Sequence, residues 1–268
     1  MSRHHLQLPI VTPSSIDLHA HNDRESRRAP GNYGDWMKIN CVIDPRDDIF
    51  RFFATHPLAA NPVREYLCDG WRTLSELILV LESVERPLLK ARSVLEFASG
   101  FGRFTRHLVK AMPGRITCSD VQPGSVDFTR EQFGADGFYS AGDAQALRIP
   151  GQYDLVFVLS LFTHLPPDRW APWLEKLFCA VAPGGALLFS VHNEARGHEL
   201  GVKFDAEGRH FIASSESPSL GADAYGTTFT TRAFAEREVA RALPGNRMDH
   251  REIAFWDGQD AIIVGKPL

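Results

Sequence analysis

Residues 93–103, SVLEFASGFGR, constrain the fold of this chain more than any other part of the sequence. A short apolar run is followed by a turn of small residues, and apolar residues then recur at helical spacing at Phe101, Phe104, Leu108 and Met112. This order predicts a buried strand, a tight turn and a helix with one buried face. Such a turn lets the backbone approach a ligand, and the helix N-terminus offers unpaired N–H groups to it. The segment therefore predicts a nucleotide-type binding site.

The glycines of the turn do not by themselves decide which nucleotide binds there. A dinucleotide fingerprint has the form G-x-G-x-x-G. Gly100 and Gly102 are present, but Thr105 occupies the position of the third glycine. An acidic residue, Glu96, instead precedes Gly100 by four positions.

Further strand-like segments follow at the spacing of an alternating α/β fold. Residues 115–120 form a second short strand that ends on Asp120, and a carboxylate in that place can accept both hydroxyls of a ribose. Residues 153–160 are a continuous apolar run, which is typical of a central parallel strand buried on both faces. Residues 161–167 read LFTHLPP, and a fifth strand is predicted over 186–191 after the turn at 183–185.

Glu96 and the glycine turn resemble motif I of class I S-adenosylmethionine-dependent methyltransferases, and residues 161–167 are similar to a segment that follows the fourth strand in that family. The resemblance covers about residues 91–268. Ala98 departs from the family pattern, which has glycine there. Because alanine excludes backbone conformations that only glycine adopts, we expect a slightly different shape of the turn.

The resemblance implies S-adenosylmethionine as the cofactor and identifies the residues expected to contact it. Glu96 is expected near the methionine amino group, Asp120 at the ribose and Asp143 at the adenine amino group. Arg103 and Arg106 are expected on an exposed helix face, with contact to the cofactor carboxylate as the alternative. The other expected contacts follow the strand ends: Ala98, Ser99, Gly100, Gly102, Val121, Ala144, Leu159 and Ser160.

The end of the chain distinguishes the methyltransferase fold from that of a dehydrogenase. Residues 251–256 and 260–265 are joined by Asp257, Gly258 and Gln259, which predicts a β-hairpin. A hairpin adds an antiparallel strand to an otherwise parallel sheet, as methyltransferases of this class have. We therefore predict an α/β, doubly wound, Rossmann-like fold. Its seven-stranded sheet is mostly parallel with an antiparallel C-terminal hairpin strand, and helices precede it.

Two regions are expected, residues 1–90 as an N-terminal arm and helical cap and residues 91–268 as the methyltransferase domain. Within the first region, about forty residues have little periodicity and are expected to be loosely ordered, or ordered only against a partner or the main domain. Helices are predicted over 47–56 and 62–84. Residues 193–231 are expected to be an insertion near the acceptor site, with 203–212 folding as a small hairpin.

Methyl transfer is an in-line displacement that depends mainly on alignment, to which a base adds when the acceptor is a hydroxyl. His192, just beyond the fifth strand, is the first candidate for that base. His164 is the second, with a packing role as its alternative, and His198 and His210 in the insertion are expected to be solvated. No metal site is predicted, because the H-x-H spacing within residues 17–21 lacks a barrel strand and further ligands.

Composition limits the classes of partner. The formal net charge is −4, so no electrostatic field favours nucleic acid. The sequence has no membrane-spanning run, and its four cysteines without C-x-x-C spacing suit a reducing cytoplasm.

The predicted function is O-methylation of a small molecule or sugar unit. A methyltransferase-like cofactor-binding protein without catalysis and, with less support, a nicotinamide-dependent oxidoreductase are the alternatives. The oligomeric state is not predicted.

Overall fold

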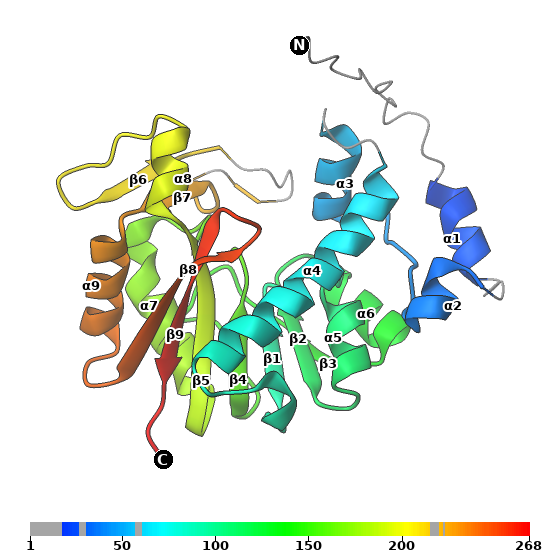
Figure 1. Ribbon diagram of the computed structural model, residues 1–268, viewed down its shortest axis with the longest axis horizontal. Coiled ribbons are helices and arrows are strands. Elements are labelled where there is room, and N and C mark those ends of the chain that lie inside the picture. The colour runs from blue at the N-terminus through cyan, green and yellow to red at the C-terminus, as the bar shows by residue number, and fades with distance from the viewer. Residues whose placement is uncertain (1–17, 27–30, 57–60, 215–219, 222) are drawn as a thin grey trace, which may run out of the picture.

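The computed structural model describes residues 18–26, 31–56, 61–214, 220–221 and 223–268. A central sheet is flanked by helices on both faces, as Figure 1 shows. The N-terminal helices lie at one end of the sheet, and the segment that precedes the last helix lies at the other.

Five neighbouring strands form the main parallel part of the sheet, an antiparallel hairpin pairs with the last of them, and a further short strand of the insertion pairs parallel with it. The parallel strands, in spatial order, are β3 (Asp136–Tyr139), β2 (Ile116–Asp120), β1 (Val94–Phe97), β4 (Tyr153–Val158) and β5 (Val181–His192). β9 (Gln259–Gly265) runs antiparallel to β5, and β8 (Arg247–Phe255) pairs with β9. The α/β class, the mostly parallel sheet and the C-terminal hairpin predicted from sequence are thereby confirmed.

The insertion enlarges the sheet of the described residues from the predicted seven strands to nine. β7 (Thr227–Thr230) joins β5 through the pair His192 and Phe229, and β6 (Arg209–Ile212) runs antiparallel to β7. The small hairpin predicted within 203–212 is wrong. Asp205 accepts hydrogen bonds from the backbone N–H groups of Glu207 and Arg209, which closes a turn there, and the partner strand comes from later in the chain.

Helices bury one face each against the sheet. α4 (Pro62–Ser83), α5 (Thr105–Ala111) and α6 (Ser125–Phe133) lie on one side, and α7 (Trp170–Cys179) and α9 (Arg232–Ala242) lie on the other. Phe104, Leu108 and Met112 are buried as their spacing predicts, although α5 begins only at Thr105. The side chains of α7 that face the sheet are also buried: Trp170, Trp173, Leu174 and Leu177.

The N-terminal region is more ordered than its composition predicts. Residues 18–26 form α1 (Leu18–Ser26), and α2 (Tyr33–Met37) follows. His21 donates through Nε2 to the carbonyl oxygen of Cys41, and Asn22 exchanges two hydrogen bonds with the backbone of Ile43. Asn40 also donates to Gln132 of α6, so of the two expectations for this arm, order against the main domain is the one that residues 18–26 and 31–40 show. Residues 1–17 and 27–30 lie outside the described residues.

The next two helices confirm their predictions and lead to the sheet. α3 (Asp48–Thr55) is capped by Asp47, whose carboxylate accepts from the N–H groups of Ile49 and Phe50. α4 has Asn61 as its N-cap and proline at its first position. α3 packs against α4, so the N-terminal helices are joined to the sheet through α4.

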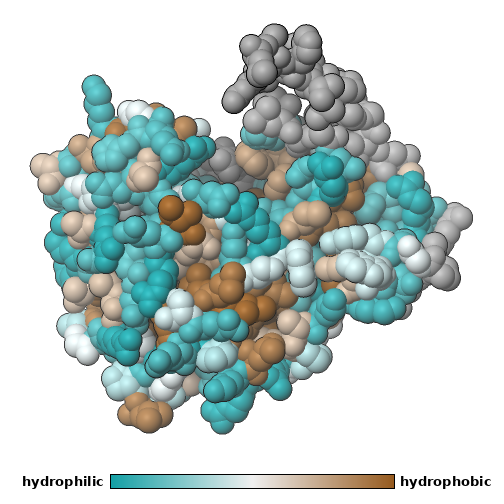
Figure 2. Space-filling view, viewed as in Figure 1, coloured by the Kyte–Doolittle hydropathy of each residue, from teal (hydrophilic) through white to brown (hydrophobic). Residues whose placement is uncertain are grey.

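The remaining helix, α8 (Glu194–Glu199), opens the insertion. No helix among the described residues is long and apolar enough to cross a membrane. Figure 2 shows apolar surface over α4 and the hairpin of β8, where the exposed hydrophobic side chains are Trp71, Leu79 and Ile253.

Candidate functional site

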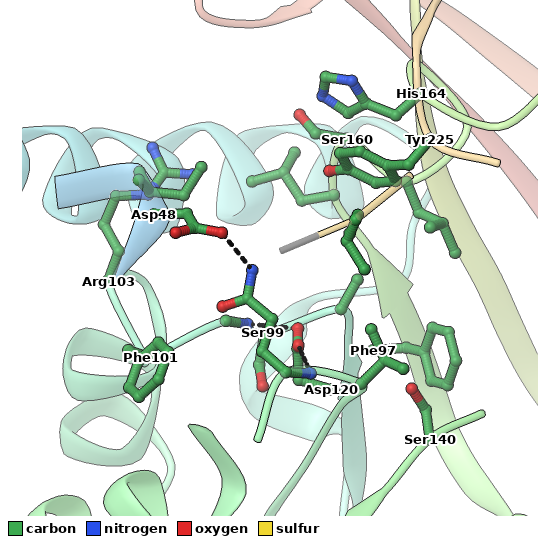
Figure 3. Close-up of a pocket in the computed structure, with 18 of the residues that line it drawn as sticks. Asp48, Phe97, Ser99, Phe101, Arg103, Asp120, Ser140, Ser160, His164 and Tyr225 are labelled. Atoms are coloured by element: carbon green, nitrogen blue, oxygen red, sulfur yellow. Dashed lines mark hydrogen bonds between the residues drawn. The ribbon is translucent and has the colours of Figure 1, made fainter. Parts of the chain in front are cut away.

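A cavity of about 470 Å³ lies at the carboxyl ends of β1, β2 and β4. α3 and four insertion residues, Leu220, Gly221, Ala224 and Tyr225, close it, and the turn between β8 and β9 contributes Trp256. Figure 3 shows Asp48 and Arg103 on one side, Ser160, His164 and Tyr225 on another, and Asp120 with Ser99 between them. The volume is that of a small-ligand site.

The turn after β1 adopts a left-handed backbone at the position where the sequence departs from its family. Ala98 has φ 61° and Gly100 has φ 55°, and both line the cavity. Ala98 thus takes the conformation that glycine favours, which costs an L-residue about 1–2 kcal/mol. Ser160, at the end of β4, has φ 61° as well. Strained residues therefore follow two neighbouring strands at the cavity, as is common at ligand sites.

Replacing Ala98 by glycine should relieve this strain. We expect the free energy of unfolding to rise by roughly 0.5–1.5 kcal/mol. The matched control is Ala111→Gly in α5, which should lower it by about 1 kcal/mol because glycine weakens a helix. Urea unfolding measures both, and an equal loss of stability in the two variants would contradict the assigned strain.

Asp120 fastens this turn to the end of β2. Its Oδ2 accepts from the N–H of Gly100 at 2.7 Å, and its Oδ1 accepts from the N–H of Gln122 at 2.8 Å. Burial raises the pKa of this carboxyl. Val121 also lines the cavity, and Gln122 donates to Asp48 of α3, which connects the cap to the sheet edge.

Glu96 is buried within β1, and its side chain points toward the start of α5. Its Oε2 accepts from the hydroxyl of Thr105 at 2.8 Å. Thr105, which occupies the place of the third glycine of a dinucleotide fingerprint, therefore holds the acidic residue of the motif. Burial, reinforced by the charge of Asp120, raises the pKa of Glu96 to about 8.

This raised pKa predicts a pH dependence of stability. Between pH 4.5, the ordinary pKa of the group, and about pH 8, the folded chain keeps a proton on Glu96 that the unfolded chain releases. The contribution of Glu96 to the free energy of unfolding therefore falls as the pH rises through that window. The slope is at most about 1.4 kcal/mol per pH unit. The variant Glu96→Gln should lose this decline between pH 5 and 8 relative to the unchanged chain. Identical slopes in thermal or urea unfolding would show that the carboxyl is ionised in the folded state.

Arg103 in the turn and Arg106 in α5 have different surroundings. Arg103 lines the cavity, forms an ion pair with Asp69 of α4 and lies over the ring of Trp256, 4.7 Å from its centroid. Arg106 is buried and donates to the carbonyl oxygens of Asn40, Val42 and Gly102. The expected place of both arginines on an exposed helix face is therefore wrong, because Arg103 precedes α5 and is largely buried, and residues 40–42 cover Arg106.

Both candidate bases line the cavity. Nδ1 of His164 donates to the carbonyl oxygen of Gly226 at 2.6 Å, and Nδ1 of His192 donates to that of Thr228 at 2.9 Å. A neutral imidazole that carries its proton on Nδ1 presents Nε2 as an acceptor. Burial lowers the pKa of His164, which favours this neutral form. The two rings are 6.5 Å apart between centroids, and His164 stacks on Tyr225 at 4.4 Å.

Most of the predicted cofactor residues meet at this cavity: Glu96, Ala98, Ser99, Gly100, Asp120, Val121, Leu159 and Ser160. Three do not line it. Asp143 is exposed and accepts from the N–H of Gln145, Ala144 is buried in the core, and Gly102 lies against Phe133. The third strand instead brings Ser140, Ala141 and Gly142 to the cavity. His198 and His210 of the insertion are not among its lining residues.

Several lining residues were not predicted from the sequence. From the sequence, Asp48, Ile49 and Phe52 of α3 were predicted only as part of a helix, and Trp256 was predicted only as part of a hairpin. Tyr225 lies in the insertion that was expected near the acceptor. Pro166 and Pro167 of the sequence motif fix the loop that carries His164, but nothing local indicates which distant residues meet it.

The comparisons with known proteins agree with this geometry. Residues 94–185 match the family model described as a methyltransferase domain. The malonyl-[acyl-carrier protein] O-methyltransferase of Acetivibrio thermocellus is 24% identical over 127 residues, which cover 47% of this chain and 44% of that protein. The chain thus spans less than half the length of this curated relative.

Two solved structures share the fold. A putative O-methyltransferase from Nostoc punctiforme is 16% identical, with a TM-score of 0.54 over 93% of this chain and 67% of that one. A glycopeptide N-methyltransferase is 14% identical, with a TM-score of 0.51 over 74% of this chain and 91% of that one. These structures show the fold alone, and the match of residues 94–185 to the methyltransferase domain model is what supports the predicted class I S-adenosylmethionine-dependent methyltransferase domain.

The residues of the cavity fit S-adenosylmethionine, the cofactor of this class. Asp120 lies at the end of β2 and Glu96 within β1, next to the turn. The hydroxyl of Ser99 is buried at the cavity and has no hydrogen-bond partner in the structure, so a bound ligand can satisfy it. The cofactor carries a positive sulfonium, which suits a cavity lined by carboxylates.

Proposed function

We propose that this protein is an S-adenosylmethionine-dependent methyltransferase that methylates an oxygen atom of a small molecule or sugar unit. The observation that carries the proposal is a single cavity in which Asp120 and Glu96 meet two histidines whose Nδ1 atoms donate to backbone carbonyls. One cavity therefore contains both carboxyl groups suited to the cofactor and a base suited to a hydroxyl acceptor.

Three residues would hold the cofactor. Asp120 would accept from the ribose hydroxyls, Glu96 lies where it can meet the methionine amino group, and Arg103 would face the methionine carboxylate. When bound, the cofactor supplies a methyl group on a positively charged sulfur. The chain contributes alignment, because α3 and the insertion residues that line the cavity would enclose the reacting groups and limit the entry of water.

The choice of oxygen over nitrogen rests on the histidines. A hydroxyl must lose its proton as it accepts the methyl group, and an imidazole with an acceptor nitrogen can take that proton. His192, which is the last residue of β5 and not beyond it as predicted, stays the first candidate, and His164 has the same tautomer and a lowered pKa. Known structures with this fold include both O- and N-methyltransferases, so the comparison leaves this choice open.

The acceptor would lie between the cap and the insertion. Residues 1–90 supply α3, and residues 193–231 supply Tyr225, which supports a division into a cap, a methyltransferase domain and an acceptor-side insertion. The modest negative charge favours a small-molecule or glycan acceptor over nucleic acid. Four cysteines without a disulfide support a reducing compartment such as the cytoplasm.

Incubation with S-adenosylmethionine and a set of hydroxylated small molecules tests the proposal. Mass spectrometry should detect a methyl ether together with S-adenosylhomocysteine, and Asp120→Ala should abolish both. Methylation confined to amines would contradict the O-methyltransferase assignment. Tight binding of S-adenosylhomocysteine without turnover of any acceptor would favour a cofactor-binding protein without catalysis.

A further inference from the structure

We propose that the acceptor is a phenol, an uncharged aromatic molecule that is methylated on its hydroxyl oxygen. This proposal rests on the proposed function and narrows its acceptor. The charges that line the cavity, the aromatic residues at its acceptor side and the orientation of His164 carry it independently of one another.

The lining is strongly acidic. Four aspartates line the cavity, Asp47, Asp48, Asp69 and Asp120, together with Glu96, whose carboxyl keeps its proton up to about pH 8. Among the described lining residues, Arg103 is the sole lysine or arginine, and it already pairs with Asp69 and lies against Trp256. A carboxylate or phosphate acceptor would therefore meet like charge without a counter-ion of its own. An amine acceptor would be held in its protonated form, which has no lone pair to accept a methyl group.

The acceptor side of the cavity is apolar and aromatic. Ile49 and Phe52 of α3 keep 37% and 39% of their surface exposed and both line the cavity, so an apolar ligand would cover them. On another side, Tyr225 stacks on His164 with only 17° between the ring planes. Figure 3 shows the Tyr225 ring on the side of His164 that faces Ser99 and Asp120. A flat ring suits this enclosure, whereas a sugar would leave most of its hydroxyls unpaired against Ile49 and Phe52.

His164 is suited to a weakly acidic hydroxyl. Its Nδ1 is occupied by the carbonyl of Gly226, so Nε2 is the nitrogen that can accept a proton. Burial lowers the pKa of this ring, which makes it a weak base. A phenolic hydroxyl, with a pKa of about 10 as in tyrosine, is close enough in acidity for such a base, and an alkyl alcohol is much less acidic.

The atoms of the step balance. The phenolic oxygen forms its bond to the methyl carbon as the carbon–sulfur bond breaks, and that electron pair stays on sulfur. The phenolic proton passes to Nε2 of His164 and then to solvent. The products are a methyl aryl ether, S-adenosylhomocysteine and one proton, and no oxidant, reductant or metal enters the reaction.

Matched naphthalene derivatives test the proposal by calorimetric titration into protein saturated with S-adenosylhomocysteine. We expect 2-naphthol to bind at least tenfold more tightly than 2-naphthoate. Given S-adenosylmethionine, 2-naphthol should also be methylated faster than 2-naphthylmethanol, 2-naphthoate and 2-naphthylmethylamine. Equal or tighter binding of the naphthoate, faster methylation of any of those three, or no binding of 2-naphthol would overturn the proposal.

A positive charge introduced on the surface of α3 that lines the cavity adds a test that does not depend on turnover. Ile49→Arg places a cation at the acceptor side, so the ratio of 2-naphthoate to 2-naphthol affinity should rise at least tenfold, while Leu79→Arg in α4, outside the cavity, should leave it unchanged. An unchanged ratio in Ile49→Arg would overturn the placement of the acceptor. Failure of S-adenosylhomocysteine to bind would instead refute the proposed function itself, which separates the two cases.

Discussion

Replacing Asp120 by alanine should weaken the binding of S-adenosylhomocysteine by roughly a hundredfold. The substitution removes a carboxylate that would accept from two ribose hydroxyls, and each charge-assisted hydrogen bond contributes about 1.5–3 kcal/mol. It also leaves the N–H groups of Gly100 and Gln122 without their present acceptor, so the turn that would cradle the cofactor loses its anchor. Isothermal titration calorimetry measures the change directly.

The control for this prediction is Asp136→Asn. Asp136 is an exposed carboxylate on the neighbouring strand β3 and does not line the cavity, so its loss should change the affinity less than twofold. Asp120→Asn, which keeps the shape of the side chain, should lie between the two. Equal affinity in Asp120→Ala and the unchanged protein, with both folded by circular dichroism, would refute the ribose-binding role.

Arg106→Leu should lower the free energy of unfolding by roughly 3–5 kcal/mol. Arg106 is 1% exposed, and its guanidinium donates to the carbonyl oxygens of Asn40 and Val42 as well as to that of Gly102 in the turn. Leucine fills part of the volume but leaves these buried carbonyls without a donor, which costs about 1–3 kcal/mol for each unsatisfied group. Urea unfolding should show the loss, and hydrogen exchange should rise at residues 39–43.

Arg130→Leu is the matched control. Arg130 lies on the exposed face of α6, and its replacement should change stability by no more than about 0.5 kcal/mol. If the two variants were equally stable, Arg106 would not connect the N-terminal region to the first turn. Loss of cofactor affinity in Arg106→Leu without loss of stability would place its role in the site instead.

Periodicity and turn chemistry were sufficient to predict four parallel strands, the C-terminal hairpin and the helices α3, α4 and α5. The apolar run of β4, the spacing along α5 and the Asp-Gly hairpin each act locally, so the sequence displays them directly. Glu96, Gly100 and Asp120 could be predicted for the same reason, because strand ends and the first turn bring them together.

The rest of the cavity depends on contacts between distant parts of the chain. The meeting of Arg103 with Asp69 and Trp256 joins three elements that no local pattern relates. Arg106 appeared exposed because its helix alone was considered, whereas residues 40–42 cover it. The pairing of β6 with β7 was missed because the partner strand lies after a segment of weak periodicity.

The identity of the cofactor is the central claim, and calorimetric titration of the unchanged protein with S-adenosylhomocysteine and, separately, with NADH tests it most directly. We expect micromolar binding of S-adenosylhomocysteine and no detectable binding of NADH. Binding of NADH with no binding of S-adenosylhomocysteine would contradict this assignment and would favour a nicotinamide-dependent oxidoreductase instead.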